Sequence, residues 1–504
     1  MEIIITTAYT SFFIFLIQKL RFFEIAGLSK NTISFLLIIK VCAGIALWAV
    51  YTFYYTDRAT ADIYKYFDDS KLMYDALFTA PSDYFKMLFG IGNSTPHFSQ
   101  YYSHMNNWYR EYESALINDN HTIIRFNALV RLFSFGYYNV HTVFMSFISL
   151  IGMVALYKFF YEHVKLYRKL LILVLFLLPS VLFWSSGVMK EGLIFLSLGF
   201  LLLSAKRLVQ GYRHVYYFSA FAFGLFLLYH TKFYVLLTIA PALLAWSLCL
   251  RSGIRQTVIR YALVYGTFLT IALNMYHIFP DYHVIDILRY KQKDFMCLAN
   301  GGVYLKSDSA TIYIPVGKKN IVIPAFKANY YKIKTGEEFY YFKTALFDDT
   351  LKTISADTSA QYKFISNTPE TKSRIRIKRI TTPASLIYNT PEALVNTLLR
   401  PYVWESRSPL MVLPALENIF VLVLIILLVM SIRPIKQINF NLMLFCLLYA
   451  FSLHLVVGIT TPVLGAIARY KIPAMGFLLI GFMIASNTNK LFLKIPLLKR
   501  IFGE

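Results

Sequence analysis

The feature that most constrains this sequence is a succession of long apolar blocks separated by short basic loops. Residues 33–54, 170–184 and 418–432 are examples. A membrane-spanning helix needs about 20 mostly apolar residues, because the hydrocarbon core of a bilayer is about 30 Å thick. The blocks are solid apolar runs, without the alternation of a lipid-facing barrel strand. They therefore predict helices that cross a membrane, where a helix satisfies its own backbone hydrogen bonds.

Composition agrees with a membrane protein and argues against binding of nucleic acid. Of 504 residues, 57% are hydrophobic and 15% are charged, whereas soluble domains average about 25% charged residues. The net charge of +23 comes largely from Lys and Arg in loops between apolar blocks. Such loops mark the cytoplasmic side. The four cysteines predict no disulfide framework, since three lie in apolar blocks and Cys297 stands alone in its loop.

The positive-inside rule orients the blocks, because every loop placed in the cytoplasm is basic, including those with Arg251 and Arg433. The prediction is an all-α polytopic membrane protein with 10–11 transmembrane helices, the eleventh being the weaker block at residues 2–17. The ten firmer helices are expected at 33–54, 129–157, 170–184, 192–205, 215–229, 233–250, 261–279, 414–432, 439–457 and 472–485. We expect a bacterial inner (plasma) membrane protein whose active side faces the periplasm or exterior.

Two long segments are expected outside the membrane, and they divide the chain. Residues 1–280 form the first part of the membrane core and include a long first extracytoplasmic loop, residues 55–127. Residues 281–409 form a small extracytoplasmic α+β insert. Residues 410–504 supply the last three transmembrane helices and a basic cytoplasmic tail with Lys494, Lys499 and Arg500.

Local patterns predict structure inside both segments. Residues 63–88 carry apolar side chains at helical spacing, which predicts one or two amphipathic helices lying on the membrane surface. In the insert, alternating patterns predict strands at 311–316 and 320–325 around a turn at 317–319. A further strand is expected at 338–344 and a helix at 391–399.

Ionisable side chains gather at the expected outer ends of the helices, and each is a candidate for function because charge is costly at membrane depth. The candidates for binding a phosphate group are Arg469, Lys471, Lys190, Lys232, His230, Arg400 and Arg125, with Glu191 and Glu405 as acidic neighbours. In a helical bundle they would ring one cavity whose cations hold a phosphate. Other readings stay open: Lys232 and Lys471 could contact lipid headgroups, Lys190 and Glu191 could pair, and His230 could be an interfacial histidine.

The first loop supplies the candidates for base catalysis. It holds nine acidic residues, most of which are expected on the solvated surface: Asp57, Asp62, Asp68, Asp69, Asp75, Asp83, Glu111, Glu113 and Asp119. Asp62 stands out because it follows the first long outward helix by a few residues, with Tyr66 four and Met73 eleven positions later. Asp57 is its rival, since it lies nearer the helix.

This start resembles that of the GT-C superfamily of polyprenyl-phosphate-sugar-dependent glycosyltransferases, in which an acidic residue near the helix end precedes amphipathic surface helices. The Pro-Ser-x-x-x-Trp segment at 179–184 and the Arg469-Tyr470-Lys471-Ile472-Pro473 run fit the same layout. The resemblance implies inverting transfer of a sugar from a lipid-linked donor to a glycan, lipid or protein acceptor, with Asp62 as base. Ile63 stands where an acid is common, and the insert precedes the last three helices, so the branch and acceptor stay open.

The expected partners are a polyprenyl-linked sugar donor, its acceptor and membrane lipids, with no nucleic acid. The sequence identifies no certain cofactor; the resemblance leaves a divalent metal possible, but no ligand spacing demands one. A Wzy-like polysaccharide polymerase or O-antigen ligase is an alternative that Arg400, Glu405 and Arg407 would suit. A transporter is disfavoured by the lack of paired broken helices and of mid-helix charges. A structural assembly subunit, with both loops as docking surfaces, is a further reading.

Overall fold

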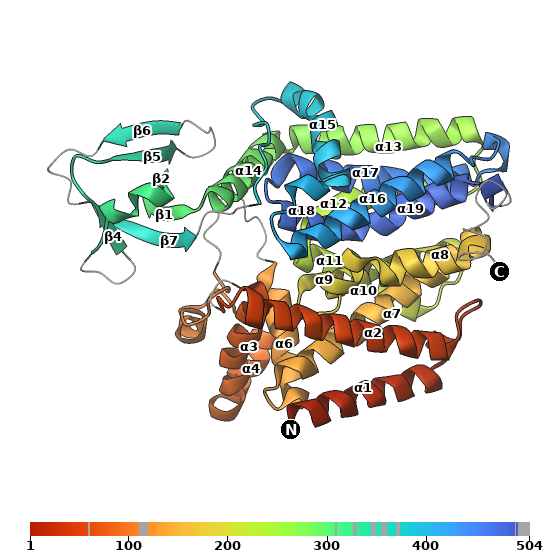
Figure 1. Ribbon diagram of the computed structural model, residues 1–504, viewed down its shortest axis with the longest axis horizontal. Coiled ribbons are helices and arrows are strands. Elements are labelled where there is room, and N and C mark those ends of the chain that lie inside the picture. Colours follow the sequence, from red (N-terminus) through yellow and green to blue (C-terminus); the bar gives the residue numbers. More distant parts are fainter. Residues whose placement is uncertain are drawn as a thin grey trace.

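A computed structural model shows a helical bundle with a small curled sheet beyond one end (Figure 1). It describes residues 1–504 except 59–60, 110–118, 308–309, 326–329, 344–348, 354–359, 369–372, 489 and 492–504. Glu111 and Glu113 of the first loop therefore lie outside the described residues, as do Lys494, Lys499 and Arg500 of the tail.

In the described chain, six helices are long and apolar enough to cross a membrane, or seven if one bent pair counts as a span. Three of them are single helices: α10 (Lys190–Val209), α16 (Pro409–Val429) and α17 (Phe440–Thr460). The other three start with α2 (Lys30–Ala49), α7 (Tyr138–Val164) and α13 (Ile254–Asn274) and continue into the helical turns that follow. The bent pair is α18 (Leu464–Tyr470) and α19 (Ile472–Ala485), whose axes differ by 58°. The bundle also contains α1 (Glu2–Lys19) and two shorter apolar helices, α11 (Val215–Thr231) and α12 (Phe233–Leu248). These features are those of an integral membrane protein.

The expected apolar blocks are helical, but two that were predicted as single helices are interrupted. The block at 129–157 is not one helix, because the chain breaks between α6 (Asn120–Ser134) and α7 at Phe135 and Gly136, both with positive φ. The block at 170–184 is also interrupted. It consists of α8 (Arg168–Ile172), a π-helical turn at Leu173–Leu177 and α9 (Pro179–Trp184). Proline explains this break, since it removes a backbone donor and restricts the residue before it.

The first loop folds into a helical cap at one end of the bundle, made of α3 (Asp62–Thr79), α4 (Pro81–Phe89), α5 (Ser99–Tyr102) and α6 (Figure 1). Helices α3 and α4 confirm the prediction of one or two helices over residues 63–88. Their apolar residues pack within the cap, and polar contacts join them: Tyr84 donates to the carbonyl of Ala128 at 3.2 Å, and Arg131 Nε donates to Ser70 Oγ at 2.8 Å. Contact of these helices with a membrane surface stays a prediction.

The described part of the insert contains an antiparallel sheet of order β3-β4-β7-β1-β2-β5-β6 between α14 (Val284–Asn300) and α15 (Pro383–Leu398). Its strands are β1 (Gly302–Ser307), β2 (Ala310–Ile314), β3 (Val322–Pro324), β4 (Tyr330–Ile333), β5 (Glu338–Lys343), β6 (Asp349–Thr353) and β7 (Tyr362–Thr368). The strands expected on either side of residues 317–319 are not partners: β2 pairs with β1 and β5, whereas β3 pairs with β4. A 3₁₀ helix at Val316–Ile321 separates them. The helix expected at 391–399 begins earlier, at Pro383, where Thr382 caps it.

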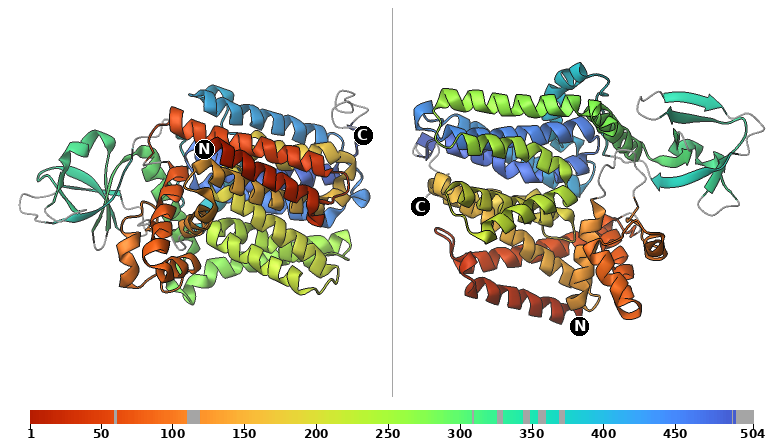
Figure 2. Two further views of the ribbon diagram at one scale, coloured as in Figure 1. Left: turned by 90° about the horizontal axis from the view of Figure 1, so that it is seen from below. Right: turned by 180° about the vertical axis from the view of Figure 1, so that it is seen from behind.

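The connections predicted to be cytoplasmic gather at the end of the bundle away from the cap and the sheet (Figures 1 and 2). Hydrogen bonds tie several of them together there. Lys206 Nζ donates to the carbonyl of Phe159 at 3.1 Å, Asn441 to that of Trp246 at 3.0 Å, and Arg433 Nε to that of Ser486 at 2.6 Å. The bundle thus has one basic end and one end that bears the long segments.

Candidate functional site

Several ends of helices meet beneath the cap, and each brings a charged side chain. Asp62 is the first residue of α3, Lys190 and Glu191 open α10, and Arg469 lies in the last turn of α18. Asp119 directly precedes α6, and Lys232 joins α11 to α12. We call this set the ionic network: Asp62, Asp119, Lys190, Glu191, Lys232 and Arg469.

Arg469 holds one half of the ionic network. Its Nε and Nη2 donate to the two carboxylate oxygens of Glu191, at 2.6 and 3.2 Å, in a bidentate pair. Its Nη1 donates to Asp62 Oδ2 at 3.0 Å. The guanidinium therefore fixes Asp62 against the start of α10, although the two acids are far apart in sequence. Bidentate geometry of this kind is available to arginine and not to lysine.

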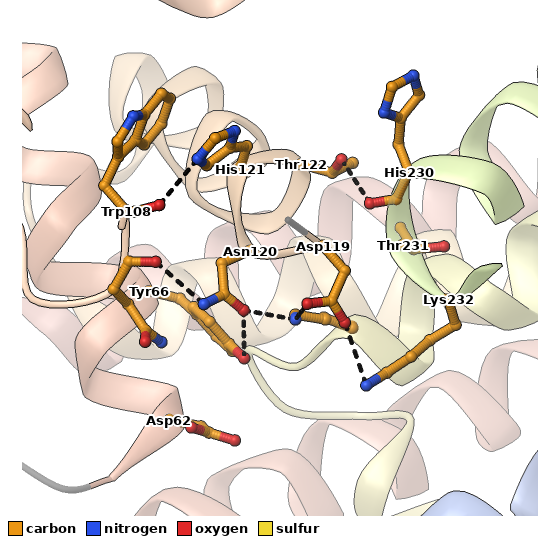
Figure 3. A network of polar contacts seen from close by, with 12 residues as sticks. Asp62, Tyr66, Trp108, Asp119, Asn120, His121, Thr122, His230, Thr231 and Lys232 are labelled. Atoms are coloured by element: carbon orange, nitrogen blue, oxygen red, sulfur yellow. Dashed lines mark hydrogen bonds and ion pairs between the residues drawn. The ribbon is translucent and has the colours of Figure 1, made fainter. Parts of the chain in front are cut away.

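Asp119 holds the other half, as Figure 3 shows. Its carboxylate lies 2.8 Å from Lys190 Nζ and 3.3 Å from Lys232 Nζ. Lys190 also donates to Asn120 Oδ1 at 2.5 Å, and Tyr66 OH donates to the same oxygen at 3.4 Å. The two lysines are thereby bound to the segment that leads into α6. The formal charges of the six side chains in the ionic network cancel, which lowers the cost of burying them.

Asp62 differs from the rest of the ionic network in its exposure. Its side chain is 40% exposed, whereas those of Arg469, Glu191 and Lys190 are 10%, 2% and 1% exposed. Partial burial favours its neutral form, but the charge and hydrogen bond of Arg469 outweigh this and hold the pKa of Asp62 below its usual value of 3.8. Asp62 is therefore an ionised carboxylate that a solute can reach, fixed by a buried guanidinium.

A second polar cluster surrounds Lys471. Lys471 Nζ donates to Asn418 Oδ1 at 2.6 Å and to the carbonyl of Thr397 at 3.0 Å. Arg400 and Glu405 pair with each other at 3.3 Å close by, and the Arg400 carbonyl lies 3.5 Å from Lys471 Nζ. Lys471, Arg400 and Glu405 thus belong to a second cluster beside α16. Arg407 is exposed.

The remaining candidates occupy other places. The backbone carbonyl of His230 accepts from Thr122 Oγ1 at 3.0 Å, while its ring points away from Lys232 (Figure 3). Arg125 Nε donates to the carbonyl of Met87 at 2.8 Å and its guanidinium lies over the Trp108 ring, so it supports the cap. Asp57 is exposed in the loop between α2 and α3.

The expectation that most loop acids are solvated was wrong for three of them. Asp69 is 1% exposed and accepts from the backbone N–H groups of Asn106 and Asn107 at 2.7 and 2.8 Å. Asp83 is buried and lies 2.7 Å from His97 Nε2. Asp119 binds two lysines. Buried carboxylates need such partners, and these three organise the cap.

Two charged residues inside candidate spans were overlooked. Lys40, in the middle of α2, is fully buried and donates to Ser185 Oγ at 2.7 Å. Glu417, in α16, is 4% exposed and accepts from the N–H and Oγ of Ser180 at 2.6 and 2.9 Å. A bent helix pair is also present, at α18–α19. The expectation that charges are absent from the middle of the helices was therefore wrong.

Lys40 holds the turn that presents Lys190 and Glu191. Ser185 begins this turn, and the carbonyl of the next residue, Ser186, accepts from Ser146 Oγ of α7 at 2.9 Å. Helices α2 and α7 thus clamp the turn from two sides. A lysine inside an apolar block was a visible signal in the sequence, since such residues are rare in spans.

Among the described residues, no group of three or more His, Cys, Asp or Glu side chains could hold a metal ion. No protein-family model, curated protein or solved structure matches this chain.

Proposed function

We propose that this chain is a membrane glycosyltransferase that moves a sugar from a polyprenyl-phosphate-linked donor to an acceptor on the extracytoplasmic face. The proposal includes a bacterial inner membrane and ten or eleven crossings, with α11 and α12 among the spans. One observation carries it: Asp62 is an accessible carboxylate held by the buried Arg469, at the junction of the cap and the bundle.

The proposed reaction uses the ionic network as follows. An acceptor hydroxyl or amine approaches Asp62 and attacks the anomeric carbon of the donor. The new glycosidic bond forms as the bond from the anomeric carbon to the phosphate oxygen breaks, and the configuration inverts. The acceptor proton passes to Asp62, and the polyprenyl phosphate leaves with the bonding electron pair. Cations fixed before the reaction stabilise that leaving charge without reorganisation.

The phosphate must compete with carboxylates for these cations, because Arg469 binds Glu191 and Asp62, and Lys190 and Lys232 bind Asp119. Arg469 is the best placed of the three, since it contacts the accessible Asp62. A donor phosphate that takes the Nη1 hydrogen bond of Arg469 would also release Asp62 from it and raise the basicity of Asp62.

Transport is the second candidate, because specific observations favour it. Lys40 and Glu417 are buried in candidate spans, and the bent α18–α19 pair carries Arg469 at its junction. Broken helices and intramembrane charges are features of transporter sites. For a polymerase or ligase, the candidate residues are Arg400 and Glu405, which pair with each other, and the exposed Arg407. These residues are less extensively paired than those of the ionic network.

The test is release of polyprenyl phosphate by the purified protein in proteoliposomes, from a series of radiolabelled polyprenyl-phosphate hexoses with cell-envelope acceptors. Asp62→Asn should lower the transfer rate by about 10²–10⁴-fold, the usual loss for a general base. Asp68→Asn is the control, because Asp68 pairs with Arg58 on the exposed side of α3. Full activity in Asp62→Asn, or flux of an intact solute without transfer, would overturn the proposal.

A further inference from the structure

A run of basic residues at 374–379 has a regular arrangement. Arg374, Arg376, Lys378 and Arg379 have exposed side chains, whereas Ile377 and Ile380 are buried. Basic and apolar residues alternate along most of this extended segment, so one edge faces the protein and the other carries charge. We call the four cationic side chains the basic stripe.

The backbone of this segment is fixed by hydrogen bonds. Ile375 N–H donates to the carbonyl of Pro462 at 2.7 Å, and Leu464 N–H donates to that of Ser373 at 2.9 Å. These bonds attach the segment to the connection between α17 and α18. The basic stripe therefore lies beside the turn that leads to Arg469.

A buried glutamine adds a second attachment. Gln292 of α14 is fully buried, and its Nε2 donates to the carbonyls of Lys378 and Ile459, at 2.9 and 2.7 Å. Its Oε1 accepts from the N–H of Ile380 at 2.9 Å. Hydrogen bonds of its backbone therefore hold the segment on the bundle, with the charged side chains of the stripe exposed.

The attachments also place the stripe relative to the membrane. Ile459 is in the last turn of α17, a candidate span that ends at Thr460, and Pro462 follows two residues later. The segment is thus bonded to the end of a candidate span, the level at which phosphate-bearing headgroups lie when such a helix crosses a bilayer. Long loops are outside the positive-inside rule, so a basic stripe there does not contradict the predicted orientation.

We infer that the basic stripe binds the phosphate groups of lipids at the membrane surface. Arginine suits this role because its guanidinium can bind phosphate through two parallel hydrogen bonds. Contacts within the protein include Lys378, which lies 3.1 Å from Glu392, and Arg374, which donates to Asn300 at 2.8 Å. Arg376 and Arg379 are the side chains to vary, because both are exposed arginines of the basic stripe. The inference concerns lipid binding and stands apart from the proposed transfer reaction.

The experiment measures thermal unfolding of the full-length protein in a neutral detergent as lipid is added. Phosphatidylglycerol should raise the unfolding temperature more than phosphatidylcholine does. In the Arg376→Gln/Arg379→Gln variant, the phosphatidylglycerol concentration at half effect should rise about 25-fold, since each basic residue near an anionic surface contributes about 1 kcal/mol, or roughly fivefold. The matched control is Lys318→Gln/Lys334→Gln, which removes two exposed charges from the sheet region.

Further arms identify the source of the phosphate. A response to phosphatidylglycerol alone assigns bulk phospholipid, and a response to undecaprenyl phosphate in phosphatidylcholine assigns a lipid-linked donor; both support the inference. Equal responses of the stripe variant and wild type overturn it. Stabilisation by a soluble acidic polysaccharide, with none by either lipid phosphate, also overturns it. The unfolding temperature without added lipid shows whether the variant folds normally, and unchanged transfer activity would leave the proposed function untouched.

Discussion

Arg469 and Glu191 form an ion pair that is nearly closed to solvent. Glu191→Gln keeps the shape of the side chain but removes one of the two negative charges that balance the Arg469 guanidinium. Breaking a buried pair from one side typically destabilises a protein by about 3–5 kcal/mol. We expect a loss of this size in the unfolding free energy, measured in detergent. Asp75→Asn, which breaks the exposed pair with Lys71, should cost under about 1 kcal/mol. Equal losses in both variants would show that the ionic network does not stabilise the fold.

The pKa of Asp62 predicts a pH dependence. Since Arg469 holds this pKa below 3.8, Asp62 stays ionised above that value. The kcat/KM of a reaction that needs the Asp62 carboxylate reports the enzyme before the donor binds, and should therefore show no loss from Asp62 between about pH 7 and pH 5 and fall only at lower pH. Stopped-time transfer assays across this range, at donor concentrations well below KM, check it. Glu191→Gln should not remove the plateau, because Asp62 keeps its own bond to Arg469. A rate that falls tenfold between pH 7 and pH 5 would contradict the assignment.

The sequence alone identified much of the ionic network, because charges at helix ends in an apolar chain are conspicuous. Asp62, Lys190, Glu191, Lys232 and Arg469 were candidates on that ground. Their pairing was not predictable, since it depends on contacts between distant segments. Asp119 was missed because nothing distinguishes it from the other acids of the first loop. His230 and Arg125 lie outside the ionic network, because position at a helix end does not determine where a side chain points.

At the scale of helices, α7 and α10 approach each other at glycines. A Cβ on Gly152 would collide with the backbone of Phe195, and one on Gly199 would collide with the carbonyl of Gly152. Small residues allow such close packing of membrane helices. Gly152→Ala and Gly199→Ala should each destabilise the protein by about 1–3 kcal/mol, as overpacking does. Gly266→Ala is the control, because nothing lies within 4 Å of its Cβ. Unfolding temperatures in detergent compare the three, and equal values would refute the tight crossing.

Helices were predictable where their pattern is local. Long apolar blocks and the periodicity of residues 63–88 identified them, since both depend on neighbours in sequence. Breaks were harder, because Pro179 interrupts a block whose composition is otherwise uniform. Strand pairing failed at β2 and β3 for a different reason. A short turn between two strands suggests that they pair, but distant strands compete for each edge, and β2 is occupied by β1 and β5.

For the whole molecule, the two ends of the bundle differ in kind. The cap and the sheet occupy one end, and the basic connections occupy the other (Figures 1 and 2). This separation agrees with the grouping of loops predicted from Lys and Arg, which assigned alternate connections to opposite sides. The geometry relates the ends to each other, whereas their assignment to the two sides of a cell membrane rests on the positive-inside rule.

Cysteine labelling tests that assignment in intact cells. The background variant replaces Cys42, Cys249, Cys297 and Cys446 by alanine, so that introduced cysteines report alone. Asn320→Cys, exposed near the sheet, should react with a membrane-impermeant maleimide in intact cells. Lys436→Cys, exposed between α16 and α17, should react only after the cells are broken. The opposite pattern would show that the protein has the reverse orientation in the membrane. Asp62 would then lie in the cytoplasm, where an extracytoplasmic transfer reaction could not use it. Labelling of both sites in intact cells would mean that they share a side, which contradicts the two-ended bundle.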